Sequence, residues 1–169
     1  MNAYPANLEL LFRRGVSWSS RILGWFGGDY WSHVDIVWPD GRLLGARSDL
    51  IKVGDVTYPS GFQLRPNPYE RVLDEKCISI PCTAAELARA NAWASTQIGS
   101  PYDWRAIVAF ALDRNWREEG DWFCSEAGAR YIEIALDIKL PVSDNKVPPG
   151  KLFAVAGALA AERNLMAAA

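Results

Sequence analysis

The chain has 169 residues, of which 50% are hydrophobic and 22% are charged, a composition typical of a globular protein with one packed core. We therefore expect a single domain over residues 1–169. The formal net charge of −2 gives no reason to expect a nucleic acid as partner. It leaves the oligomeric state open.

The first eleven residues have neither the basic region nor the long apolar run of a secretory signal peptide. We therefore expect a cytoplasmic protein by default, or one released by cell lysis or delivered by a phage. The apolar stretch 152–161 is too short to span a bilayer, so we expect no stable membrane insertion. Because no Cys-x-x-Cys pair occurs, we expect no metal, and no motif indicates a cofactor.

The first part of the chain predicts a short helix and several strands. Residues 8–12 predict a first element that ends in a turn at 13–15, and 17–28 predict the helix. Residues 31–38 predict a strand, and the Pro39-Asp40-Gly41 turn would return it into a hairpin through Leu43 and Leu44. Further strand-like segments follow at 50–56, 62–64, 69–73 and 77–80.

The second part predicts helices. Thr83 to Glu86 has the pattern of a capping box, and the helix behind it would close at Gly99. Another helix is expected from Tyr102, followed after 141–149 by a last strand or helix start at 152–155 and an Ala-rich end that frays. This order predicts an α+β domain in which an antiparallel β-sheet packs against helices.

Cys124 is predicted to lie in the first turn of a helix. Asp121 is a good N-cap residue. The apolar residues that recur at helical spacing behind it are Ala127, Tyr131, Ala135 and Ile138. At such a position, unpaired backbone N–H groups and the helix dipole stabilise a thiolate. The alternative is a buried cysteine that acts as a small hydrophobic side chain.

A cysteine nucleophile needs a base and a positive partner, and histidine can supply both. The only histidine, His33, lies near the start of the predicted strand 31–38. A lone histidine on a strand is usually structural. A histidine on a strand and a cysteine at a helix start together form the minimal dyad of papain-like enzymes, whose partners meet in space rather than in sequence.

Several segments resemble the NlpC/P60 superfamily in its circularly permuted branch, which contains the YiiX-like proteins and the lecithin:retinol acyltransferase relatives. His33 precedes Cys124 here, which is the permuted order. The similar segments are 17–22 with 30–37, Gly99-Ser100-Pro101-Tyr102-Asp103-Trp104, Trp122-Phe123-Cys124-Ser125-Glu126 and Pro148-Pro149-Gly150-Lys151-Leu152. The resemblance implies a permuted papain-like fold.

The resemblance also implies roles for individual residues. Cys124 would be the nucleophile, His33 the base, and Tyr102 an active-site tyrosine, unless Tyr102 is only a half-buried ring at a helix start. Eight tryptophans are many for this length. Trp31 and Trp122, in predicted loops or turns, could line a substrate groove, or they could fill the core.

The implied reaction is acyl transfer through a thioester. The first hypothesis is a cysteine hydrolase with a peptide substrate, an amidase or peptidase that acts on cell-wall peptides in a bacterial or phage setting. The second is an acyltransferase or thioesterase that acts on a lipid acyl group. The third is a non-catalytic binding module on the same fold.

The third hypothesis rests on a departure from the family pattern. The family has a polar third residue where this chain has Gly45. If the hairpin turns at Asp40, residues whose numbers add up to 80 lie opposite each other, so Asp35 faces Gly45 on the face that carries His33. We expect the Asp35 carboxylate to accept the Nδ1–H of His33, leaving Nε2 for the thiol. The alternative is an ion pair between Asp35 and an arginine such as Arg47.

Overall fold

A computed structural model describes the structure of residues 4–15, 30–68, 71–102, 123–141 and 147–168. The strands are β1 (Ala6–Gly15), β2 (His33–Val37), β3 (Leu43–Arg47), β4 (Ile51–Val53), β5 (Val56–Tyr58), β6 (Gly61–Arg65) and β7 (Val72–Cys82). The helices are α2 (Ala84–Gln97), α4 (Cys124–Leu136) and α5 (Pro149–Ala168).

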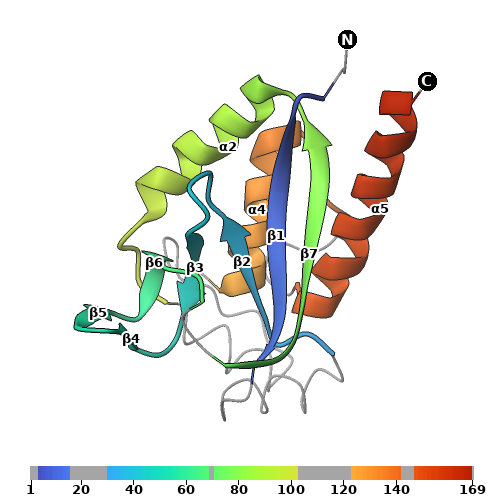
Figure 1. Cartoon of the computed structure of the whole chain (residues 1–169). Coiled ribbons are helices and arrows are strands. Elements are labelled where there is room, and N and C mark those ends of the chain that lie inside the picture. The colour runs from blue at the N-terminus through green and yellow to red at the C-terminus, as the bar shows by residue number, and fades with distance from the viewer. Residues whose placement is uncertain (1–3, 16–29, 69–70, 103–122, 142–146, 169) are drawn as a thin grey trace.

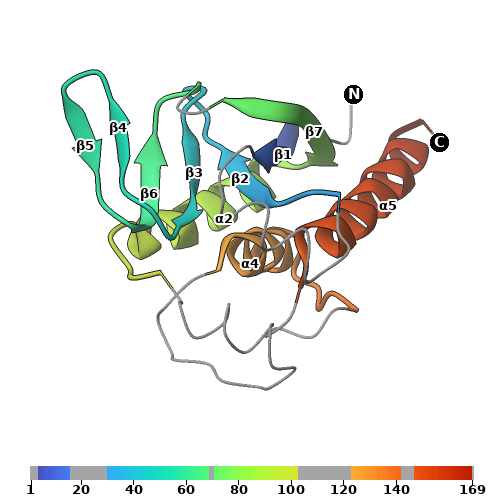
Figure 2. The same cartoon turned by 90° about the horizontal axis from the view of Figure 1, so that it is seen from below.

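Five strands form one antiparallel sheet in the order β6-β3-β2-β1-β7, and β4 and β5 form a separate hairpin (Figure 1). The helices lie on one side of the sheet (Figure 2). Helix α4 packs on β2 and β3, α2 packs on α4, and α5 lies along β7. The expected α+β architecture, an antiparallel sheet packed against helices, is confirmed.

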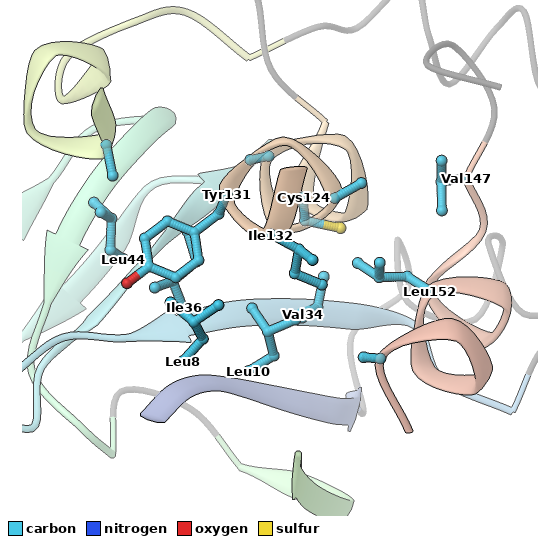
Figure 3. Packing of buried hydrophobic residues seen from close by; sticks show 14 of the residues in the cluster. Leu8, Leu10, Val34, Ile36, Leu44, Cys124, Tyr131, Ile132, Val147 and Leu152 are labelled. Atoms are coloured by element: carbon cyan, nitrogen blue, oxygen red, sulfur yellow. The ribbon is translucent and has the colours of Figure 1, made fainter. Parts of the chain in front are cut away.

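Alternating residues of the central strands build the core beneath α4. Leu8 and Leu10 of β1 and Val34 and Ile36 of β2 are almost fully buried, and they lie below the Ile132 side chain of α4 (Figure 3). Because side chains alternate along a strand, the residues between them, including His33 and Asp35, belong to the opposite face of the sheet. Packing of the core therefore also fixes which residues occupy that second face.

The predicted hairpin is confirmed in position and register. Ile36 pairs with Leu44 and Val37 with Leu43, so residues whose numbers add up to 80 do lie opposite each other. Gly41 has a φ of +85° and donates a backbone hydrogen bond of 2.8 Å to the carbonyl of Trp38. Glycine adopts this φ without steric cost, which explains the tight turn.

Three predictions for the other strands are wrong. The expected turn at 13–15 is part of β1, whose Arg13 pairs with both neighbouring strands. The segment 50–56 is not one strand, because Gly54, with a φ of +60°, turns β4 into β5. The segments 69–73 and 77–80 do not form two strands, because pairing along the whole of β1 joins residues 72–82 into the single strand β7.

The helix after Thr83 is confirmed as α2. The Thr83 hydroxyl accepts a 3.2 Å hydrogen bond from the backbone N–H of Glu86, whose carboxylate accepts one of 2.6 Å from the N–H of Thr83. The segment 152–155 belongs to helix α5, which continues to Ala168 where fraying was expected. The helix at 17–28 and the body of the one expected from Tyr102 lie outside the described residues.

Within the described part of the chain, no helix combines the length and the hydrophobicity needed to cross a membrane.

Gly61 provides a test of how the end of α2 is attached to the sheet. Its φ is +114°, and an added Cβ would lie 2.5 Å from the carbonyl oxygen of Ser100. We expect Gly61→Ala to lower the free energy of unfolding by about 2 kcal/mol or more, from backbone strain and overpacking. Gly157→Ala in α5 is the control, because its added Cβ would meet no atom within 4 Å apart from the neighbouring backbone of its own helix. Urea titration should show that this variant is unchanged or more stable by about 0.5–1 kcal/mol.

Candidate active site

Cys124 lies in the first turn of α4, as predicted; it is the first residue of that helix, and its side chain is buried. The N-cap is Phe123, in an extended conformation with no capping hydrogen bond from a side chain, so the predicted N-cap at Asp121 is wrong. Asp121 itself lies outside the described residues. The helix ends at Leu136, before Ile138, because Asp137 adopts a left-handed conformation. Cys124 therefore lies beside the N–H groups of a first helical turn.

His33 is the first residue of β2, and this strand begins at the end of the sheet where α4 also begins (Figure 1). Ser32 fixes this end of the strand. Its N–H donates a 3.0 Å hydrogen bond to the carbonyl of Arg13, and its hydroxyl accepts one of 2.9 Å from the N–H of Gly15. The charge of Cys124 and a hydrogen bond with its side chain both act on the His33 ring. This contact is possible although α4 covers the other face of the sheet, because His33 is the first residue of β2 and Cys124 is the first residue of α4. The structure thus brings the predicted cysteine and histidine together.

Asp35 lies beside the same ring. Its Oδ1 is 3.0 Å from Nε2 of His33, and both side chains are buried. The carboxylate occupies the space above Gly45, since a Cβ added at Gly45 would collide with Oδ1 of Asp35. Asp35 therefore lies over the gap at Gly45, as predicted.

The predicted assignment of the two ring nitrogens is wrong. Nε2 of His33, not Nδ1, contacts Asp35. Nδ1, the ring nitrogen nearer the backbone, is therefore not the one that Asp35 holds. Cα atoms two positions apart along a strand, such as those of His33 and Asp35, are separated by about 6.6 Å. The outer nitrogen can reach a carboxylate at that separation, whereas Nδ1 stays close to the backbone of His33 itself. Nδ1 is thus the nitrogen available to the thiol.

The electrostatic surroundings of His33 favour its charged form. Burial lowers the pKa of His33, but the negative charges of Asp35 and Cys124 and the hydrogen bonds with both raise it, to about 9. Near neutral pH the ring is therefore an imidazolium.

Asp35 has a second cationic neighbour, Arg65 of β6, which the sequence analysis missed. Nη2 of Arg65 lies 3.4 Å from Oδ1 of Asp35 and donates a 2.8 Å hydrogen bond to the carbonyl oxygen of Gly45. The alternative partner, Arg47, instead pairs with Asp49 at 2.9 Å and 3.1 Å. The signal in the sequence was limited to the position of Arg65 directly after the strand segment 62–64, which does not show which strand lies beside that segment.

The aromatic residues expected near the site differ in position. Trp31 is buried in the core, with its ring centroid 5.1 Å from that of Phe153, so its described contacts are those of a core residue and not of a groove wall. Tyr102 is also buried, and its ring lies 6.2 Å from that of Phe123, the residue before Cys124. Trp122 lies outside the described residues.

The other two cysteines occupy different environments. Burial and nearby carboxylates raise the pKa of exposed Cys77, and burial raises that of Cys82 to about 11. Both are thus protonated near neutral pH. Among the described residues, no three His, Cys, Asp or Glu side chains gather into a group that could hold a metal ion.

The sequence was also compared with known proteins. No protein-family model matches it, and no curated protein matches it.

Alkylation should identify the reactive thiol. We expect iodoacetamide at pH 7 to label Cys124 of the folded protein before Cys77 and Cys82, because only Cys124 has an imidazolium partner. Peptide mapping by mass spectrometry measures the order. Cys77→Ser is the control and should leave the fast phase unchanged. Labelling of Cys77 first would show that exposure, and not thiolate character, decides reactivity.

The raised pKa of His33 should also appear in the pH dependence of stability. Because the pKa is about 9 in the folded protein and 6.5 in the unfolded chain, its stabilising contribution is complete below pH 6.5 and disappears as the pH rises towards 9. This amounts to about 3 kcal/mol. Urea titrations at pH 6 and pH 9 should show that the stability difference between the protein and His33→Gln shrinks by about that amount. An equal difference at both pH values would contradict the assignment.

Proposed function

We propose that the protein is a cysteine hydrolase that cleaves acyl bonds through a thioester on Cys124. The observation that carries the proposal is the buried row of Cys124, His33 and Asp35, in which the imidazole lies between a thiol at a helix start and a carboxylate. Nucleophile, proton carrier and orienting group stand in the order that acyl transfer requires. A binding module would not need a carboxylate behind a buried imidazole.

The first half-reaction forms the thioester. The Cys124 thiolate attacks the carbonyl carbon, an S–C bond forms, and the carbonyl electron pair moves to oxygen. The N–H of Cys124, in the first turn of α4, would stabilise this oxyanion. When the intermediate collapses, the bond to the leaving group breaks and His33 donates its proton from Nδ1 to the departing amine. The products are the thioester, a free amine and neutral His33.

The second half-reaction returns the resting state. Neutral His33 accepts a proton from water, and the resulting hydroxide equivalent attacks the thioester carbonyl. The C–S bond breaks, releasing a carboxylic acid and the Cys124 thiolate, while His33 is again an imidazolium. Asp35 keeps the ring oriented through both steps, because its hydrogen bond to Nε2 leaves Nδ1 directed to the thiol.

The resemblance to the permuted NlpC/P60 branch supports a permuted papain-like fold and an amide in a cell-wall peptide as substrate. Two arrangements agree with it: His33 precedes Cys124 in the chain, and Asp35 supplies the carboxylate that Gly45 cannot. The described part contains an antiparallel sheet with the cysteine helix packed on it, as such a fold requires.

Trapping of the acyl group tests the proposal. The protein is incubated with cell-wall muropeptides or with acyl esters and thioesters, quenched in acid, and analysed for a mass increase on the Cys124 peptide. We expect an adduct and product release with muropeptides. Cys124→Ser should abolish both, and Asp35→Asn should slow turnover by about 100-fold or more, the usual scale for loss of acid–base catalysis.

Cys77→Ser is the matched control and should retain activity. Acylation by esters alone would move the substrate class to lipids. The absence of any adduct with every substrate, together with unchanged activity in Cys124→Ser, would contradict the hydrolase proposal.

A further inference from the structure

Arg65 is a fully buried cation placed behind the candidate dyad. It lies on β6, two strands away from Asp35, and β3 separates the two. Its guanidinium reaches across β3 at Gly45, where the missing side chain leaves room for both the Asp35 carboxylate and the approaching Nη2. One nitrogen therefore contacts the backbone carbonyl of Gly45 and the carboxylate at once. A side chain at position 45 would remove that space.

Oδ1 of Asp35 thus lies between two cations, Nε2 of His33 at 3.0 Å and Nη2 of Arg65 at 3.4 Å. Counting Cys124 as a thiolate, the charges along this row alternate in sign, and their sum is zero. Without Arg65 the row would carry one excess negative charge inside the protein. Buried groups relieve such an excess by taking up a proton.

We propose that Arg65 is a positioning residue for the Cys124–His33 pair: it holds Asp35 as a carboxylate with Oδ1 fixed on Nε2, and it balances the negative charge of the buried row. The proposal rests on the proposed function only for its significance in catalysis. The electrostatic effect exists whether or not the protein turns over a substrate.

Other charged groups surround the row and could contribute. Arg13 of β1 pairs in register with His33, and the charge of His33 acts on Asp49, which follows β3. Each of these is engaged elsewhere: Arg13 with Glu75 at 3.3 Å, and Asp49 with Arg47 at 2.9 Å. The charged groups around His33 and Asp35 are Cys124 from α4, Arg65 from β6, Arg13 from β1, and Asp49, which follows β3 and is paired with Arg47.

The rate of Cys124 alkylation against pH measures the thiolate directly and requires no substrate. In Arg65→Met we expect the midpoint of this profile to rise by about one pH unit, because Asp35 loses the cation that balances it and the row, with one excess negative charge, takes up a proton more readily. Arg65→Lys keeps the charge, so its midpoint should stay close to that of the parent protein. In the Asp35→Asn background, Arg65→Met should have a much smaller effect, because the carboxylate through which Arg65 acts is gone.

Arg163→Met is the matched control. Arg163 forms a half-buried ion pair with Glu86 at 2.8 Å, and its backbone lies in α5, away from the start of β2 (Figure 1). Its loss should reduce stability without moving the midpoint. If Arg65→Met does not fold, Arg65→Gln, which removes the charge but can still donate a hydrogen bond to the Gly45 carbonyl, takes its place in both backgrounds with the same expected outcomes.

A folded Arg65→Met with an unchanged midpoint, or an equal shift in the Asp35→Asn background, would overturn the proposal. If the shift appears but no substrate acylates Cys124, the role of Arg65 stands and the hydrolase proposal fails. If acylation occurs but the midpoint does not move, the hydrolase proposal stands and the role of Arg65 fails.

Discussion

The register between β2 and β3 determines both the core and the candidate site. With Ile36 opposite Leu44, one face of the hairpin presents apolar side chains to α4, and the other face carries His33 and Asp35. A slip by one residue would exchange these faces, so it would place the imidazole and the carboxylate among the apolar side chains under α4 and move the apolar residues to the other face. The hydrophobic free energy that stabilises the sheet therefore also holds the polar row in place.

The polar row is costly to bury, and its composition offsets that cost. An isolated ionised group inside a protein is strongly unfavourable, whereas a chain of alternating charges with hydrogen-bonding geometry is tolerated. Here His33 lies between Cys124 and Asp35, and Asp35 lies between His33 and Arg65. Loss of any inner member would leave its neighbours as uncompensated charges. The row therefore behaves as a unit, and its titration belongs to the set rather than to one residue.

Local signals predicted local structure well. The turn at Gly41, the capping box at Thr83 and the start of a helix at Cys124 could each be identified from a few neighbouring residues, and so could the opposition of Asp35 and Gly45. The continuous strand β7 could not, since it depends on pairing with β1, which is distant in sequence.

Arg65 was missed for the same reason. Its contact with Asp35 requires knowing that β6 lies beside β3. The choice of Nε2 over Nδ1 depends on the position of the His33 ring in the fold, which no sequence pattern records.

The space above Gly45 also restricts how this site can change over evolutionary time. A carboxylate at position 45 would lie opposite residue 35, on the face of the hairpin that carries the imidazole. With Asp35 in place, a Cβ at position 45 would collide with its Oδ1, and a chain with a carboxylate at neither position would lose the acceptor that Asp35 gives His33. Transfer of the carboxylate from one strand to the other therefore has to cross an intermediate that is either strained or inactive. Residues 35 and 45 must therefore change together, although each change on its own is a single amino-acid substitution.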